Sequence, residues 1–455
     1  MRIAIIGAGL TGLMLSLYLA RRGYQIDIYE QRPDPRMTTH RFDKGRKMSI
    51  DLSSRGLLSL TEIGLAEKIL SKSVPMRDRI IHLPNEEIIS LAYGKYENDC
   101  IHTVSRSQLH FDLLHETESV PAIMVHFNQV FVDMDTTSGE SILFDNNLKK
   151  QYNIKPFFLF GCDGANSMVR KCIEKQKEST FQHSYFPYQY KELTIPYLEN
   201  HPLQLEAMHM WPRKNSMLVA QPNYDHSFTC AFLLPSTGEY SFEMLEKDHP
   251  PQKMLTYFKD QYSDVFPFIS NLENDLYNNP IGSLVTINEG HWNLDKVALM
   301  GDSMHAMVPF LGQGLNCCFE DCYLFNQFLD KYNDDWQTAI PAFEELRKKD
   351  TNAITIMSLE NYPELFDSDL QKSILLREIE HYLMVNFKDS FATYHNLTCF
   401  SLHSYSYINS IRLIQKEMIK DISQTINNIK ELNKEKIQLF LEDYHKKICE
   451  MNVMN

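Results

Sequence analysis

The chain lacks long apolar runs, paired cysteine motifs and clusters of basic side chains. No stretch of about 18 apolar residues occurs, so we expect no segment that spans a bilayer. The 9 cysteines follow neither a disulfide nor a zinc spacing, and Cys317, Cys318 and Cys322 fall within one expected helix, which favours buried free thiols. A formal net charge of −14 without any basic cluster argues against nucleic acid and anionic membranes as main partners.

The remaining composition is that of an ordinary globular protein, with 43% hydrophobic and 23% charged residues. A chain of 455 residues is long enough for two domains or for one large composite domain. Met1 leads directly into the strand-like segment 2–6, which leaves no room for a signal peptide. We therefore expect a protein of a reducing compartment, namely the cytoplasm.

A glycine-rich turn near the N-terminus has the context of a dinucleotide-binding motif. The apolar strand Ile3–Ile6 leads into a Gly-x-Gly-x-x-Gly sequence, and a helix is expected over Leu13–Ala20. In such a motif Gly7 permits the tight turn, Gly9 lets a pyrophosphate approach the backbone, and Gly12 lets helix and strand pack closely. The N–H groups at the start of the helix would bind the phosphates.

An acidic residue then narrows the choice of nucleotide. Glu30 follows a second expected strand, Gln25–Tyr29, at the position where a carboxylate accepts hydrogen bonds from the adenosine ribose. Its charge would repel a 2′-phosphate, which leaves FAD or NAD for this pocket. No second Gly-x-Gly-x-x-Gly motif occurs, which argues against a reductase with paired Rossmann domains.

Two further glycine-containing segments follow apolar strands later in the chain. Gly161-Cys162-Asp163-Gly164-Ala165 comes after Phe157–Phe160, and Ser167 is the expected cap of the next helix. An Asp-Gly turn alone is common, so this segment indicates a flavin site only in combination with the other glycine segments. Asp302 comes directly after Gly301 and the apolar strand Val297–Met300, where it can accept a hydrogen bond from a flavin ribityl hydroxyl.

The segment Pro309-Phe310-Leu311-Gly312-Gln313-Gly314 precedes a helix that begins near Leu315. Free N–H groups at that helix start would stabilise negative charge on a reduced flavin ring. His305 lies between the two segments, and a structural role is favoured for it because flavin chemistry does not always need a base. The order and separation of all these segments predict one FAD site and chemistry on a small aromatic molecule.

Taken together, the segments from Met1 to about Phe343 resemble the single-component FAD-dependent aromatic monooxygenases typified by p-hydroxybenzoate hydroxylase. A closer similarity, which extends over nearly the whole chain, is to the kynurenine 3-monooxygenase family. The flanking segments that carry this similarity are Tyr29–Arg36, Met76–His82, Tyr190–Leu193, Met307–Phe310 and Leu359–Tyr362.

The resemblance implies which residues bind the cofactor and the substrate. Together with the motif glycines Gly7, Gly9, Gly12 and Gly314, the FAD contacts would be Leu10, Glu30, Arg32, Ser53, Arg106, Asp302, Leu315 and Asn316. Arg79 and Tyr93 would bind the substrate carboxylate, and Asn361, Glu364 and Tyr405 would complete that polar end. The apolar wall against the aromatic ring would consist of Met217, Val219, Leu233 and Phe310. No side chain is assigned as certainly catalytic, because the flavin carries the chemistry, and no metal is expected.

The chain departs from the family pattern at two places near these residues. The family commonly reads Gly-Arg-Ser-Ile-Asn-Leu where this chain has residues 45–52, so that Asp51 stands in place of an amide. Leu311 replaces a residue that is often His in related sequences, which removes any proton role there. Glu360 and Glu364 are one helical turn apart with Pro363 between them, so at most one of the two faces the pocket.

The C-terminal third is expected to be helical. An apolar stripe of Ile411, Ile414, Met418, Ile419 and Ile422 follows a helical period, and helical patterns extend over Leu375–Phe387 and Ile408–Ile448. Charged and amide residues interrupt 422–448, which favours a soluble helix covering the active site over a peripheral membrane helix.

The predicted fold is α/β, with a Rossmann-like FAD-binding domain, an interleaved β-sheet substrate domain and a helical C-terminal region. The FAD-binding domain would comprise 1–75, 101–175 and 286–345. The substrate domain would comprise 76–100 and 176–285, and the helical region 346–455.

The resemblance implies hydroxylation of L-kynurenine to 3-hydroxykynurenine in tryptophan degradation, with bound FAD, with NADPH and O2, and through a flavin C4a-hydroperoxide. A monomer or a homodimer is expected. One alternative is a hydroxylase of the same group that acts on another aromatic acid or a phenol. A flavin-dependent oxidase or a halogenase-like protein is disfavoured, because Trp211, Trp292 and Trp336 each lack a Trp two positions away and so form no halogenase motif.

Overall fold

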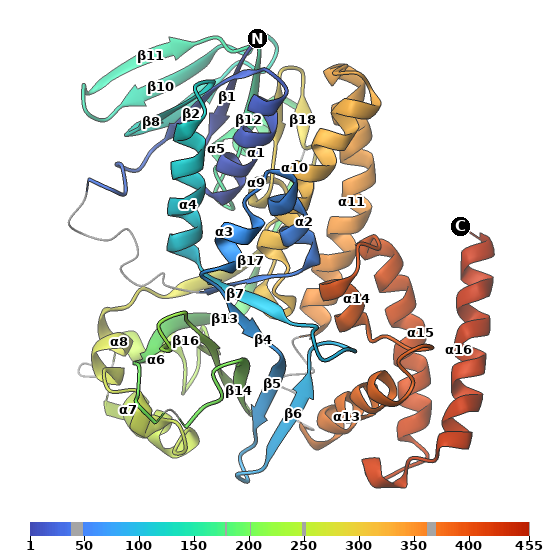
Figure 1. Ribbon diagram of the computed structural model, residues 1–455. Coiled ribbons are helices and arrows are strands. Elements are labelled where there is room, and N and C mark those ends of the chain that lie inside the picture. Colours follow the sequence, from blue (N-terminus) through green and yellow to red (C-terminus); the bar gives the residue numbers. More distant parts are fainter. Residues whose placement is uncertain (38–48, 178–179, 201, 248–251, 362–369, 455) are drawn as a thin grey trace.

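Two large sheets and a C-terminal group of helices make up the fold in the computed structural model, which describes residues 1–37, 49–177, 180–200, 202–247, 252–361 and 370–454. In Figure 1 the first sheet lies at the top, the second at the lower left, and the C-terminal helices at the right. This α/β architecture, with its helical C-terminal region, is the predicted fold class. The segment bounds of the domains remain predictions.

The first sheet forms because its inner strands are short apolar runs, which favour burial on both faces of a parallel sheet. Its strands lie in the order β18 (Asn293–Leu294), β19 (Val297–Leu299), β12 (Phe158–Gly161), β1 (Arg2–Ile6), β2 (Gln25–Glu30) and β8 (Ile123–Phe127). All neighbouring pairs are parallel except β18 with β19. Helices associated with this half are α1 (Leu10–Arg21), α2 (Ser54–Glu62), α3 (Ala66–Leu70), α4 (Arg106–Ser119), α5 (Met168–Lys177), α9 (Asp302–His305) and α10 (Gly314–Lys331).

Two small antiparallel sheets extend this half. One contains β9 (Gln129–Met134), β10 (Ser141–Asp145) and β11 (Lys150–Ile154). The other contains β3 (Ser49–Leu52), β7 (Ile101–Ser105) and β4 (Val74–Met76), and it lies where the first half meets the second sheet.

The second sheet is buried on both faces, but each face packs against different partners. Its order is β17 (Gly282–Glu289), β13 (Phe181–Ile195), β16 (Phe228–Pro235), β15 (Ser216–Pro222), β14 (Ala207–Arg213), β5 (Asp78–His82) and β6 (Ile88–Ala92). On one face, residues such as Leu218 and Phe232 join a core with the segment that contains α6 (Phe242–Lys247), α7 (Gln252–Gln261), η1 (Phe266–Phe268) and α8 (Leu272–Asn278). On the other face, Met217 and Leu233 belong to a separate apolar cluster that turns toward the first half.

The C-terminal third is helical, as predicted, but its division differs from the expected pattern. The helices are α11 (Trp336–Asn361), α13 (Leu370–Asn386), α14 (Tyr394–Phe400), α15 (Tyr405–Ser423) and α16 (Lys434–Met454). The expected run 408–448 is split between α15 and α16, because the polar segment after Ser423 forms turns and the short helix η3 (Ile429–Glu431). The stripe from Ile411 to Ile422 is buried or partly buried, and α15 packs against α13 and α16.

The position of α16 at the outside of the molecule contradicts the expectation that the helix over 422–448 covers the active site. This helix lies at the edge of the molecule in Figure 1 and packs on α15. The residues of the C-terminal third that line the central cavity come instead from α11, α13 and α14.

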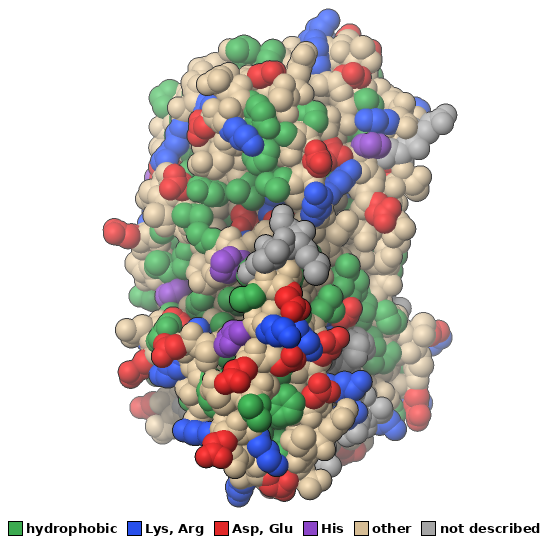
Figure 2. Space-filling view, turned by 90° about the vertical axis from the view of Figure 1, so that its right-hand side faces the viewer, with side chains coloured by type: hydrophobic (Ala, Val, Ile, Leu, Met, Phe, Trp, Pro, Cys, Tyr) green, Lys and Arg blue, Asp and Glu red, His purple; other side chains and the backbone are tan. Residues whose placement is uncertain are grey.

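Among the described residues, no helix combines the length and the apolarity needed to cross a bilayer. On the face shown in Figure 2, Lys and Arg side chains are interspersed with Asp and Glu.

Candidate flavin and substrate site

The three glycine segments, far apart in the sequence, meet at the carboxyl ends of β1, β12 and β19. Gly7 has a φ of +106°, and a Cβ there would lie 2.5 Å from the carbonyl oxygen of Cys162, so a larger residue cannot occupy this position. The backbone N–H of Met300 donates to the carbonyl of Gly161 at 3.0 Å. The backbone N–H of Gly164 donates to the Ser303 hydroxyl at 2.9 Å. One edge of the sheet therefore carries all three segments.

The first turn has the geometry of a dinucleotide cradle. A Cβ on Gly12 would lie 2.1 Å from the carbonyl oxygen of Gly7, whereas no described atom lies within 4 Å of a Cβ position on Gly9. Helix α1 begins directly after Gly9, with its free N–H groups at this opening. The close packing and the open position are those that Gly12 and Gly9 were predicted to supply.

Glu30 is buried at the end of β2 and held by several donors. Its carboxylate accepts hydrogen bonds from the backbone N–H of Ala8 at 2.9 Å and from the side chain of Arg32 at 2.8 Å. Although burial opposes ionisation, these hydrogen bonds and the charge of Arg32 keep the pKa of Glu30 below its usual value. The acid predicted to bind the ribose is therefore fixed as a carboxylate beside the turn.

A cavity of about 440 Å³ extends from this edge toward the second sheet and the C-terminal helices. Of the residues predicted to bind cofactor or substrate, the following line it: Gly9, Leu10, Ser53, Arg79, Tyr93, Arg106, Met217, Val219, Leu233, Asp302, Phe310, Gly314, Leu315 and Asn361. The remainder, apart from Glu364, lie outside its lining: Gly7, Gly12, Glu30, Arg32, Asn316 and Tyr405. Glu364 falls outside the described residues.

The polar end of the cavity is formed by β5, the segment after β6, and α11. Arg79 lies on β5 with its guanidinium 5.2 Å from the centre of the Tyr93 ring. Its Nε atom is buried without a hydrogen-bond partner among the described residues, and burial lowers its pKa. Burial raises the pKa of Tyr93 well above its usual value, so the phenol stays protonated and can donate. These groups can bind a carboxylate.

Asn361 ends α11 and connects this polar end to the cofactor side. Its Nδ2 atom donates to the backbone carbonyl of Phe310 at 2.7 Å. Its Oδ1 atom accepts from Arg377 at 3.2 Å and from the Tyr394 hydroxyl at 3.4 Å. The tyrosine beside Asn361 is therefore Tyr394, whereas the Tyr405 hydroxyl donates to the cavity residue Gln313 at 3.0 Å.

Two further cavity residues, Arg377 and His395, are not marked by any motif. They lie on α13 and α14, where a single polar residue carries no functional signal in the sequence. The pKa of His395 is well below its usual value because of burial and of the neighbouring charges of Arg79 and Arg377. His395 is therefore neutral at physiological pH, and its buried Nε2 atom has no hydrogen-bond partner among the described residues.

The predicted apolar wall is continuous. Met217 and Val219 occupy alternate positions of β15, so their side chains point to the same face. Met217 stands opposite Leu233 in the antiparallel pair of β15 and β16. Phe310 closes the wall, with its ring 5.3 Å from that of Phe186. This surface suits an aromatic ring and leaves little room for water.

At the cofactor side, Asn316 fixes the segment that precedes α10. Its Oδ1 atom accepts from the backbone N–H of Ser53 at 2.9 Å, and its Nδ2 atom donates to the carbonyls of Asp51 at 2.8 Å and Gly312 at 2.9 Å. Asn316 is fully buried, and its contacts join β3 and the start of α2 to the start of α10. It therefore positions the backbone of the helix start.

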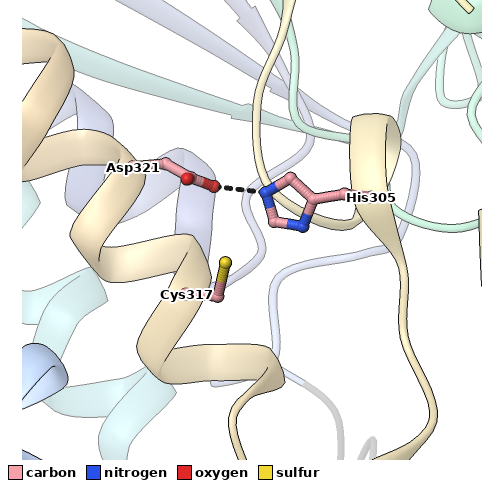
Figure 3. A group of neighbouring side chains, drawn as sticks. All are labelled: His305, Cys317 and Asp321. Atoms are coloured by element: carbon pink, nitrogen blue, oxygen red, sulfur yellow. Dashed lines mark hydrogen bonds and ion pairs between the residues drawn. The ribbon is translucent and has the colours of Figure 1, made fainter. Parts of the chain in front are cut away.

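Figure 3 shows a buried cluster formed by His305, Cys317 and Asp321. The Nε2 atom of His305 lies 2.6 Å from Asp321, and the Arg347 guanidinium donates to Asp321 at 2.9 Å and to the Cys317 sulfur at 3.2 Å. Burial raises the pKa of Cys317 well above its usual value, so this thiol is a poor metal ligand. The cluster is part of a hydrogen-bonded network between α9, α10 and α11, and His305 is not among the residues that line the cavity. Cys317, Cys318 and Cys322 are buried and free, as predicted.

Comparisons with known proteins agree with this geometry. The family described as FAD binding domain matches residues 1–243. Kynurenine 3-monooxygenase of Legionella pneumophila (strain Corby) is 36% identical over 452 residues, with 99% of each chain covered. Kynurenine 3-monooxygenase of Myxococcus xanthus (strain DK1622) is 34% identical and covers 93% of this chain and 90% of its own. A solved structure of 2-methyl-3-hydroxypyridine-5-carboxylic acid oxygenase has the same fold, with a TM-score of 0.66, 18% identity and coverage of 83% and 95%.

The first match assigns residues 1–243, which contain the first two glycine segments, to the FAD-binding flavoproteins. With the near full-length relatives, the chain belongs to the kynurenine 3-monooxygenase family of NADPH-dependent flavoprotein monooxygenases. FAD is its cofactor, with NADPH and O2 as co-substrates. The residues present fit FAD, because the Glu30 carboxylate, the open Gly9 position and the helix start at Gly314 suit its adenosine ribose, its pyrophosphate and its flavin ring.

Proposed function

We propose that this protein hydroxylates L-kynurenine to 3-hydroxykynurenine, the reaction for which its relatives are named. The observation that carries the proposal is the division of one cavity into a cationic end and an apolar wall beside the cofactor segments. Arg79 and Tyr93 fit the carboxylate of an amino acid, and the surface around Met217 and Phe310 fits its aromatic ring.

Bound FAD would supply the redox chemistry, which takes a hydride from NADPH, places one oxygen atom of O2 on the ring and releases the other as water. The chain supplies binding, orientation and exclusion of water. Arg79, Tyr93 and Asn361 hold the amino-acid end, which fixes the distance of the ring from the cofactor. The backbone N–H groups at Gly314 and Leu315 stabilise negative charge on the reduced cofactor. No protein base is needed, because the aromatic amine already enriches the ring with electrons.

The test is anaerobic reduction of the purified holoprotein by NADPH in a stopped-flow instrument. We expect L-kynurenine to accelerate reduction strongly, because enzymes of this kind make reduction wait for substrate. A panel of aromatic acids and phenols serves as control for the alternative of a related hydroxylase with another substrate. Acceleration by a panel member and not by L-kynurenine would refute the proposal and identify that alternative.

The cellular setting follows from the same proposal. The free, mostly buried cysteines suit a reducing compartment such as the cytoplasm. Binding roles of the individual site residues are part of the proposal, and the expected monomer or homodimer remains a prediction.

A further inference from the structure

A hydrogen-bonded pair of polar side chains, Asp51 and Gln221, borders the apolar wall of the cavity. The Nε2 atom of Gln221 donates to both carboxylate oxygens of Asp51, at 2.8 and 3.0 Å. Both residues line the cavity, and they come from β3 and β15, which belong to different sheets. Recognition of a carboxylate by Arg79 does not require this pair, and FAD retention does not explain Gln221.

The position of the pair relates it to the ring of the substrate. Gln221 follows Met217 and Val219 at alternate positions of β15, so it continues the same face of the wall. Asp51 lies against the turn before α10, where its Oδ2 atom would be 3.1 Å from a Cβ on Gly312. The pair therefore stands where the ring wall meets the cofactor segments, and Asp51 also faces Tyr93.

The chemistry of the pair defines what it can bind. A carboxylate has about four lone-pair sites, of which Gln221 occupies two, so Asp51 can accept from a further donor in the cavity. Resting on the proposed function, we infer that Asp51, oriented by Gln221, accepts a hydrogen bond from the aromatic amine of the substrate and thereby selects 2-aminoaryl substrates. Because hydroxylation occurs at the carbon beside that amine, the same contact would turn this carbon toward the cofactor. Asp51 is thus a positioning and specificity-determining residue.

The contact should depend on pH, because burial raises the pKa of Asp51 to about 7 while the bond from Gln221 opposes the rise. The titratable groups facing Asp51 are Tyr93, from the segment after β6, and Cys399, from α14. Both have raised pKa values, with that of Cys399 at about 12, so neither titrates near neutrality. An aromatic amine donates and scarcely accepts, so it prefers the ionised carboxylate. Affinity for the amine should therefore rise as the pH rises through about 7.

The experiment compares binding of L-kynurenine with that of its analogue lacking only the ring amine. Dissociation constants are measured from the change in flavin absorbance of the holoprotein at pH 6 and pH 8, without turnover. For the unchanged protein we expect a preference for L-kynurenine at pH 8 of roughly tenfold or more, the usual effect of a hydrogen bond to a charged group, and a smaller preference at pH 6. Asp51→Asn should abolish the pH dependence and reduce the preference, because a neutral amide oxygen accepts a weaker hydrogen bond than a carboxylate.

Two other variants complete the test. Gln221→Leu keeps the carboxylate and removes the donor that lowers its pKa, so the pH dependence should move to higher pH. Asp225→Asn, an exposed carboxylate in the turn after β15, is the matched control and should behave like the unchanged protein.

The outcomes separate this inference from the proposed function. If the unchanged protein ignores L-kynurenine altogether, the proposed function fails. If it binds L-kynurenine but Asp51→Asn keeps the full preference for the amine, the inference alone is overturned. It is also overturned if Asp51→Asn shifts the flavin reduction potential of the substrate-free protein while the preference stays, because the carboxylate would then serve the cofactor.

Discussion

At the scale of single residues, burial decides what the ionisable groups of the cavity can do. It lowers the pKa of Arg79 and raises that of Tyr93, and with nearby cations it keeps His395 neutral. Burial destabilises the charged form of the Arg79 guanidinium. A substrate carboxylate would stabilise that form, since it supplies the negative charge that the described residues around Arg79 provide only weakly. The site is therefore poised for an anionic ligand.

Replacement of Arg79 by Ala should weaken substrate binding while FAD stays bound. Loss of a charge-assisted hydrogen bond costs about 1.5–3 kcal/mol, so we expect KM to rise roughly 10- to 150-fold. The control is Arg77→Ala, because Arg77 flanks the same strand but pairs with Glu206 at the surface. Steady-state kinetics and the flavin spectrum are the measurements. Loss of flavin in Arg79→Ala would show that this side chain contacts the cofactor instead.

At the scale of elements, the start of α10 depends on how tightly α2 packs beside it. A Cβ on Gly56 of α2 would lie 2.4 Å from the Oδ1 atom of Asn316, the atom that accepts the Ser53 N–H. Gly56 therefore leaves room for the side chain that fixes the cofactor-facing backbone. Helix propensity alone would favour Ala at this position by about 1 kcal/mol.

Substitution of Gly56 by Ala should lower FAD affinity even though it favours the helix. Displacement of Asn316 leaves the Ser53 N–H unsatisfied, which costs about 1–3 kcal/mol, or roughly 5- to 150-fold in the FAD dissociation constant. In an Asn316→Ala background the added methyl group has no amide to displace, so the same substitution should have little further effect. Fluorescence titration of the apoprotein with FAD measures all four variants. Equal effects of Gly56→Ala in both backgrounds would contradict this coupling.

At the scale of the whole molecule, the cavity is a junction of three parts. The first sheet brings the glycine segments, the second sheet brings the ring wall, and α13 and α14 bring Arg377 and His395. None of these parts encloses the site alone. A ligand that contacts all three should therefore stabilise elements that share no hydrogen-bonded sheet.

Hydrogen exchange followed by mass spectrometry can test this arrangement. L-Kynurenine added to the holoprotein should slow exchange in β15 (Ser216–Pro222) and in α14 (Tyr394–Phe400), because both line the cavity. The helix α16 (Lys434–Met454) is the internal control and should exchange unchanged, since its described residues pack on α15 outside the cavity. Protection of α16 with no change in α14 would show that the ligand binds elsewhere.

The sequence by itself determined the features that depend on local constraint. Gly7 and Gly12 have no room for a Cβ, and Glu30 must stand at the end of its strand. Each of these residues therefore occupies a fixed position relative to the others, which can be recognised in the sequence. The β-α-β order, the Asp302 position and the helix start at Gly314 were predictable for the same reason.

Only the tertiary structure decided which distant side chains meet. It placed Tyr394 rather than Tyr405 beside Asn361, brought His395 into the cavity, and paired Asp51 with Gln221 across two sheets. Such contacts arise from the packing of whole elements, which imposes no fixed spacing along the chain. The local sequence around a polar residue in a helix or at the end of a strand is therefore the same whether that residue faces solvent or a substrate.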